Sequence, residues 1–276
     1  MKQLGIILLL GLFIRLISFS WIIHTPQNGD LLRYVDWGRI AFLKGFNQTY
    51  NKETITFGGD PNNQPPGSLY PISLAYYSHL KAANIIHKIY KESPWQENQT
   101  NQAILYFFMR LPSFIAEILL TIIIFLFVRK QKGKYPLLAA AFLYLNPVLI
   151  YNSAFWGQMD AINNLFFITA LVLITSGKIV NSVMFSSLSC MTKLSILPLL
   201  PLYLIQFFKQ RLSIKQLIAS IAASIGVVLL LTLPVSKQPI IWLTNFIHLA
   251  SGGELQNITS EAYNLWYVPF FFSTLS

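Results

Sequence analysis

The chain has 276 residues, of which 54% are hydrophobic and only 11% are charged. Soluble domains carry about 25% charged residues, so an ordinary soluble enzyme and a disordered chain are both excluded. The formal net charge is +10, but the basic residues adjoin apolar stretches instead of forming a basic face with interleaved aromatic residues. This pattern argues against nucleic acid as a partner and favours a membrane lipid surface.

The apolar stretches predict an all-α polytopic membrane protein with about seven transmembrane helices in a single module, 1–276. No cleavage site follows the first stretch, so it is expected to be an uncleaved helix. The fifth and sixth stretches are short and are expected to form a hairpin that turns near Thr192 and Lys193. The predicted spans are 4–23, 102–128, 136–152, 159–176, 179–193, 194–208 and 214–234.

Charge gives the predicted spans a direction. Two basic loops stay in the cytoplasm, and both can do so only if 179–208 turns back on itself. Most acids then fall outside, and Glu117 alone lies within a span. The sequence therefore predicts an outer loop at 24–101, an outer segment at 235–265 and a truncated last span at 266–276. The basic loops contain Arg129, Lys130, Lys132 and Lys134, and Lys209, Arg211 and Lys215.

The outer loop is expected to contain surface helices. Residues 31–43 are amphipathic with a helical period, which is typical of a helix lying on a membrane. Residues 51–67 are rich in Gly, Pro and Asn and predict a loop. Residues 69–90 predict a second interfacial helix or a pair of them. They could instead form an extra span, but this would reverse the direction of everything that follows, against the basic loops.

Two polar clusters in this loop are candidates for chemistry. Asp30 follows the first span directly, where a carboxylate can act as a general base; it can equally be the N-cap of the helix that begins at Leu31. Pro65 and Pro66 stiffen the second cluster, which either shapes a pocket floor or is a passive connector.

A third cluster joins the third and fourth spans with the run Trp156-Gly157-Gln158-Met159-Asp160. An aromatic face beside an amide and a carboxylate suits the recognition of a sugar. The alternative is an interfacial tryptophan anchor followed by a capping Asp160.

Cations form the fourth cluster. Lys193 lies at the tip of the hairpin, and Arg15 and Arg110 lie within spans, where a charge needs a counter-ion. A lipid phosphate fits this role, although each cation could also extend towards the membrane surface. His248 could assist a phosphate, or it could be a solvated surface residue.

These motifs together resemble the GT-C superfamily of membrane glycosyltransferases, which use polyprenyl-phosphate sugars. The most specific match is the Trp-Gly-Gln-Met-Asp run, and the resemblance covers nearly the whole chain. It implies a substrate-binding set comprising Asp36, Trp37, Pro65, Pro66, Tyr70, Trp156, Gln158, Asp160, Asn264 and Trp266.

The resemblance implies an inverting transfer of a hexose, mannose or glucose, to a glycan, polysaccharide or protein acceptor outside a bacterial-type cell membrane. Asp30 would be the general base, with Asp36 as second choice. Lys193, helped by Arg15, Arg110 or His248, would bind the donor phosphate. No cofactor is expected, although a divalent metal shared by Asp30 and Asp160 stays open. The competing hypothesis is a flippase that moves the same lipid without chemistry.

Overall fold

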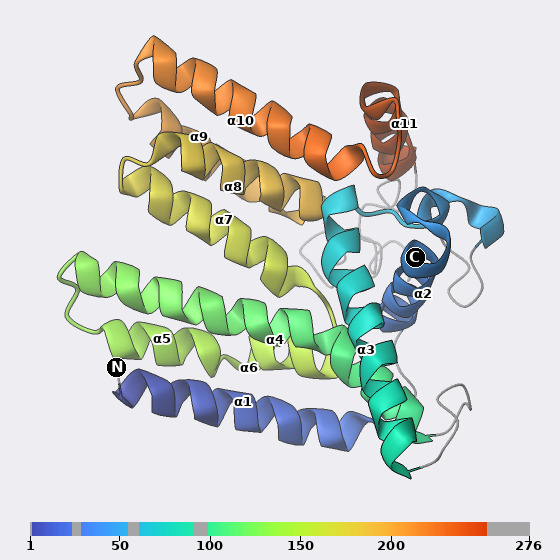
Figure 1. The fold of residues 1–276 in the computed structure, drawn as a ribbon. Coiled ribbons are helices and arrows are strands. Elements are labelled where there is room, and N and C mark those ends of the chain that lie inside the picture. Colours follow the sequence, from blue (N-terminus) through green and yellow to red (C-terminus); the bar gives the residue numbers. More distant parts are fainter. Residues whose placement is uncertain (1, 24–28, 55–60, 91–98, 253–276) are drawn as a thin grey trace, which may run out of the picture.

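A computed structural model describes residues 2–23, 29–54, 61–90 and 99–252 (Figure 1). Within these ranges the chain is all-helical and contains no strand. Four helical segments are long and apolar enough to cross a membrane, as expected of a polytopic membrane protein, and three further apolar helices are shorter. The long segments are Lys2–Ile22, Asn101–Lys130, Pro136–Trp156 and Ile214–Thr232, and the shorter ones are Asp160–Thr175, Ile179–Thr192 and Leu194–Phe208.

The apolar helices lie side by side, and the chain direction alternates from one to the next (Figure 1). Pro112 lies inside the longest helix. Pro136 and Pro147 begin two others, at positions where the missing N–H costs no hydrogen bond. The helices of this bundle are α1 (Lys2–Ile22), α4 (Gln99–Lys130), α5 (Pro136–Tyr144), α6 (Pro147–Ile150), α7 (Asp160–Thr175), α8 (Ile179–Thr192), α9 (Leu200–Phe208) and α10 (Ile214–Thr232).

The predicted surface helices form a platform across one end of the bundle (Figure 1). The 31–43 prediction corresponds to α2 (Gly29–Lys44), whose apolar face is buried as its period indicated. The 69–90 segment is one helix, α3 (Leu69–Tyr90), instead of a pair. Three 3₁₀ turns also belong to the platform, η1 (Phe46–Tyr50), η2 (Lys52–Thr54) and η3 (Pro66–Ser68). The segment 235–265, expected only as an outer segment, contains a further helix, α11 (Pro239–Gly252).

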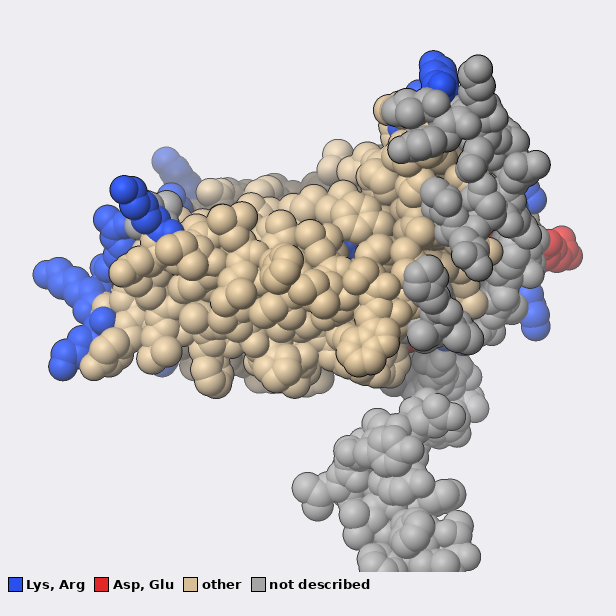
Figure 2. Space-filling model, turned by 90° about the horizontal axis from the view of Figure 1, so that it is seen from below, with Lys and Arg blue, Asp and Glu red and all other residues tan. Residues whose placement is uncertain are grey.

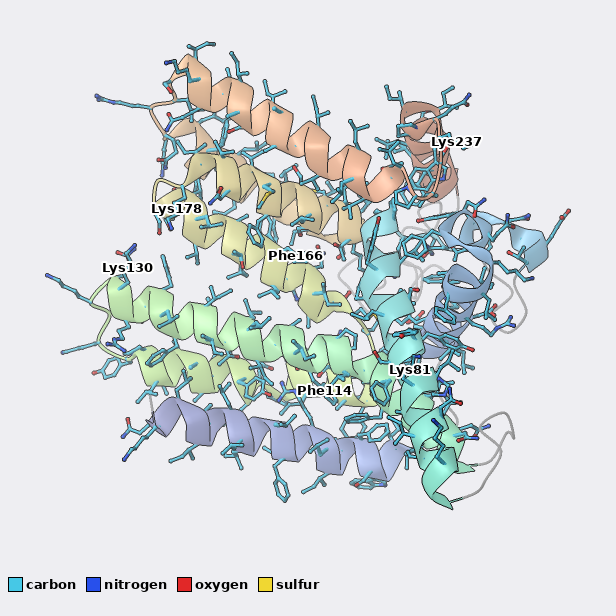
Figure 3. All side chains as sticks on the ribbon, viewed as in Figure 1. Lys81, Phe114, Lys130, Phe166, Lys178 and Lys237 are labelled. Atoms are coloured by element: carbon cyan, nitrogen blue, oxygen red, sulfur yellow. The ribbon has the colours of Figure 1, made fainter. Side chains whose placement is uncertain are left out.

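The two ends of the bundle differ in charge. Figure 2 shows lysine and arginine side chains gathered at one end and an uncharged band along the bundle. Figure 3 places Lys130 and Lys178 at that end, Phe114 and Phe166 along the bundle, and Lys81 at the platform end. The α4–α5 and α9–α10 connections, which carry the two predicted basic loops, both lie at this end (Figure 1).

Of two connections near the platform end, the first differs from the sequence prediction and the second agrees with it. The third span was expected to end at residue 152 and to lead into a loop, but the helix continues through a π-helical turn, η4 (Tyr151–Trp156), and ends at Gly157 with φ +79°. The predicted turn at Thr192 and Lys193 is present, because α8 ends at Thr192 and Lys193 is extended. A 3₁₀ segment, η5 (Leu194–Leu199), then leads into α9.

Candidate functional site

Asp30 and the tryptophan run meet at the platform end of the bundle. Asp30 lies in the first turn of α2, and its Oδ2 accepts hydrogen bonds from Trp156 Nε1 at 2.8 Å and Gln158 Nε2 at 2.6 Å. Its Oδ1 pairs with Arg33 at 3.2 Å. The Asp30 side chain is 31% exposed. The Asp30 carboxylate is therefore bound by residues more than 120 positions away in the sequence and is still partly exposed to solvent. A residue that only caps a helix needs neither feature.

Lys193 joins the same cluster from the hairpin. Its ammonium group pairs with the Asp160 carboxylate and lies 3.4 Å from Gln158 Oε1. Asn152 donates to the other Asp160 oxygen at 3.3 Å. The Gln158 amide therefore contacts Asp30 with its nitrogen and Lys193 with its oxygen, so a base candidate and a phosphate-binding candidate are separated by one side chain.

Two residues that the sequence did not single out complete this network. The Tyr34 hydroxyl donates to Gln158 Oε1 at 2.7 Å and accepts from Gln64 Nε2 at 3.1 Å. Burial raises the pKa of Tyr34 well above its ordinary value, so the hydroxyl stays protonated and can donate. Tyr34 lies within the amphipathic stretch 31–43, and Gln64 directly precedes the proline pair; neither pattern showed that their polar ends would meet.

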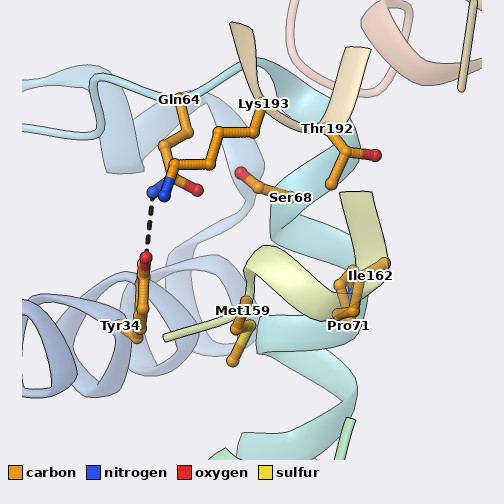
Figure 4. A pocket seen from close by; sticks show the side chains of 8 residues that line it. All are labelled: Tyr34, Gln64, Ser68, Pro71, Met159, Ile162, Thr192 and Lys193. Atoms are coloured by element: carbon orange, nitrogen blue, oxygen red, sulfur yellow. Dashed lines mark hydrogen bonds between the residues drawn. The ribbon is translucent and has the colours of Figure 1, made fainter. Parts of the chain in front are cut away.

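A small pocket lies between Lys193 and the platform (Figure 4). Its volume is about 10 Å³, which is on the order of one water molecule. The pocket is therefore too small for a ligand as large as a sugar ring while Lys193 and Gln64 stay in place. Trp156 is 41% exposed, so part of its aromatic surface is reachable beside Asp30. The pocket is lined by Tyr34, Gln64, Ser68, Pro71, Met159, Ile162, Thr192 and Lys193.

Two glycines bring these segments into contact. A Cβ on Gly157 would lie 2.9 Å from Leu31, and the positive φ also disfavours a side chain. A Cβ on Gly67 would lie 2.5 Å from the carbonyl oxygen of Met191. Gly157 therefore lets the tryptophan run approach α2, and Gly67 lets the proline loop approach the end of α8.

Arg15 does not belong to this site, contrary to its assignment as a phosphate ligand. Its Nε donates to Glu117 at 2.7 Å, and its guanidinium lies 4.1 Å from the Tyr144 ring centroid. Arg15 and Glu117 are 0% and 2% exposed. The sequence analysis proposed a lipid phosphate as the counter-ion, but in the structure Glu117 of α4 provides it.

Arg110 is also fully buried, so its assignment to the donor phosphate is not supported either. It donates to the main-chain oxygens of Ala154 at 2.8 Å, Phe155 at 3.2 Å and Tyr106 at 3.1 Å. The guanidinium thus contacts the π-helical turn from α4 instead of an outside ligand.

Asp36 and Trp37 lie beneath the site, not in it. Asp36 is fully buried and pairs with Arg39 at 3.0 Å. Trp37 is 2% exposed and packs edge-on against Tyr34. Both were predicted to bind substrate, and burial makes them supports of α2. Asp36 is accordingly a poor second choice for the base.

The proline loop reaches the site through its neighbours. Pro65 and Pro66 are buried, and Gln64 before them contacts Tyr34. Tyr70 is not part of the cluster, since its ring packs against Phe46 and its hydroxyl lies 3.4 Å from two main-chain oxygens of α10. Asn264 and Trp266 lie outside the described residues. His248 is on α11, but its side chain is also outside the description.

The described ranges contain no group of three or more His, Cys, Asp or Glu side chains arranged to hold a metal ion. Asp30 accepts from Trp156, and Asp160 pairs with Lys193.

Comparison of the chain with protein-family models, curated proteins and solved structures found no match.

Proposed function

We propose that the chain is an inverting glycosyltransferase that moves a hexose from a polyprenyl-phosphate donor to an acceptor hydroxyl at the platform end of the bundle. The observation that carries the proposal is the continuous polar connection from Asp30 through Gln158 to Lys193. This connection joins a partly exposed carboxylate to a partly exposed ammonium group, and these are the two charges that the reaction needs.

The two halves of the reaction divide between these charges. Asp30 accepts the proton of the acceptor hydroxyl, whose oxygen attacks the anomeric carbon. The bond between that carbon and the phosphate oxygen breaks, and the phosphate leaves with the electron pair. Lys193 stabilises the negative charge that grows on the departing phosphate. Trp156 and Gln158 both donate hydrogen bonds to Asp30, and Tyr34 donates to Gln158, so these contacts position the base beside a tryptophan that can contact the sugar.

The proposed membrane topology has seven spans, with the four long and the three shorter apolar helices all crossing the bilayer. Their alternating direction and the basic end seen in Figure 2 support this arrangement. The platform end then faces away from the cytoplasm. Single-cysteine variants Lys52→Cys and Lys134→Cys, made in a Cys190→Ser background, test the orientation with an impermeant thiol reagent. Labelling of Lys134→Cys but not Lys52→Cys in intact cells would reverse it.

The catalytic proposal is tested with the full chain purified into nanodiscs. Polyprenyl-phosphate mannose and polyprenyl-phosphate glucose serve as donors, a total membrane lipid extract supplies acceptors, and release of polyprenyl phosphate is measured. Asp30→Asn is expected to lower the rate by about 10²–10⁴-fold. Glu53→Gln is the control, because Glu53 is an exposed acid of the same platform in η2.

Equal release by wild type and Asp30→Asn would eliminate Asp30 as the base. Movement of labelled donor across liposomes without release of polyprenyl phosphate would instead favour the flippase.

A further inference from the structure

The segment that holds Asp30 is itself an irregular piece of backbone. Trp156 ends a π-helical turn, Gly157 is left-handed, and Gln158 follows. The last carbonyl groups of a helix have no partner within it and must find one elsewhere. In this segment the partner is Arg110 of α4.

We propose that Arg110 is a positioning residue that fixes the end of the π-helical turn, so that Trp156 and Gln158 reach Asp30. Its Nε and Nη2 donate to the successive carbonyls of Ala154 and Phe155, and its Nη1 donates to Tyr106 on its own helix. The planar guanidinium group of arginine has several N–H donors and can reach all three carbonyl oxygens at once, whereas the single ammonium group of a lysine cannot.

A second α4 residue extends the same contact. Ser113, one turn beyond Arg110, donates to the main-chain oxygen of Gln158 at 2.7 Å. α4 therefore holds the backbone on both sides of Gly157. A Cβ on Gly157 would lie 3.5 Å from the Arg110 guanidinium, an ordinary van der Waals distance, so the arginine packs directly against the turn. The cation also lies at a helix C-terminus, where the backbone dipole favours positive charge.

The first test observes the geometry without any substrate. The full chain is labelled with 5-fluorotryptophan, and Trp156→Phe identifies the Trp156 resonance in the fluorine NMR spectrum. Asp30→Asn removes the charge that the indole N–H contacts and is expected to shift this resonance. Arg110→Lys is expected to shift it too, while the Trp21 resonance stays in place.

Arg15→Lys is the matched control, since Arg15 is the other fully buried arginine among the described residues. It is expected to leave the Trp156 resonance in place. An unchanged Trp156 resonance in Arg110→Lys, or an equal shift in Arg15→Lys, would overturn the proposal.

The second test uses the transfer reaction and rests on the proposed function. Arg110→Lys is expected to lower kcat by about 10²-fold, because a small misplacement of reacting groups has effects of this size. The donor KM should change by less than about threefold. In an Asp30→Asn background, the same substitution should lower kcat by less than about twofold, since its effect acts through Asp30. Equal losses in both backgrounds would indicate general loosening and reject the positioning role.

The two tests fail separately. If Asp30→Asn retains full activity, the proposed function is wrong, while the fluorine spectra still decide whether Arg110 holds Trp156 against Asp30.

Discussion

Two ion pairs tie separate helices together, and they lie in contrasting surroundings. Arg15 and Glu117 join α1 to α4 inside the bundle and are 0% and 2% exposed. Lys193 and Asp160 join the end of α8 to the start of α7 beneath the platform and are 26% and 33% exposed. A pair of opposite charges is therefore buried inside the protein in the first case and is accessible to a ligand in the second.

The partners around each pair sharpen the contrast. Glu117 also accepts from Ser153 at 3.0 Å, and the Arg15 guanidinium lies over the Tyr144 ring. A buried charge in this position is costly once its partner is removed. Lys193 instead adjoins Gln158 and a small pocket. We therefore expect the inner pair to govern folding and the outer pair to govern chemistry.

The largest effect on stability is expected from Glu117→Gln. It leaves Arg15 buried without its counter-charge, and breaking a buried pair in this way costs about 3–5 kcal/mol. Thermal unfolding in detergent, followed by loss of the folded peak in size-exclusion chromatography, measures the change. The double variant Arg15→Met/Glu117→Met should recover most of the loss, because apolar side chains remove both buried charges. A double variant as unstable as Glu117→Gln would contradict this account of the pair.

Lys193→Gln should separate chemistry from stability. Loss of one group that stabilises a developing charge lowers the rate by about 10²–10³-fold, whereas a partly exposed ion pair contributes up to about 1 kcal/mol to stability. The transfer assay and thermal unfolding measure the two effects side by side. Lys237→Gln is the control, since Lys237 is an exposed lysine at the platform end (Figure 3). A stability loss as large as that of Glu117→Gln would make the two pairs alike and end the comparison.

Gly67→Ala tests how the outer region is assembled. The new methyl group would meet the Met191 backbone, and an extra carbon in such a contact costs about 1–3 kcal/mol. The proline loop must then move away from Lys193, so transfer activity should fall together with the melting midpoint.

Gly226→Ala provides the opposite case to Gly67→Ala. A Cβ there has nothing within 4 Å, and alanine is the better helix former by about 1 kcal/mol. Stability should therefore be kept or raised. Equal effects at the two glycines would show that the proline loop does not depend on close contact with α8.

Patterns along the chain predicted much of this fold. Apolar runs marked seven helices, and basic loops required the chain to reverse near Lys193, where α8 ends. The period of 31–43 placed Tyr34 on the buried face of α2. These features depend on local composition, so they can be predicted from the sequence.

Contacts between distant segments were less accessible. Arg15 and Glu117 lie on helices whose facing sides no periodicity specifies, so their pairing was missed. The hydrogen bonds from Tyr34 and Gln64 depend on how α2 and the proline loop pack. The motifs that contain Asp30, Gln158 and Lys193 predicted a shared site, and the structure brings these three together; their chemical roles stay a prediction.

The smallest effect should come from His79, which lies in the platform and links the comparison to pH. His79 is 8% exposed on α3 and packs beside Tyr76. Burial lowers the pKa of His79 below its ordinary value of 6.5, so the folded protein favours the neutral ring. This contribution to stability is complete above pH 6.5 and is lost as the pH falls through the folded pKa. The melting midpoint of wild type should therefore fall more than that of His79→Gln between about pH 7 and pH 5.

Parallel curves of melting midpoint against pH for the two proteins would show that His79 does not titrate with unfolding. A steeper curve for wild type would show that a pH-sensitive group lies in the platform, which also carries Asp30. The buried pair of Arg15 and Glu117 lies in the bundle and not in the platform.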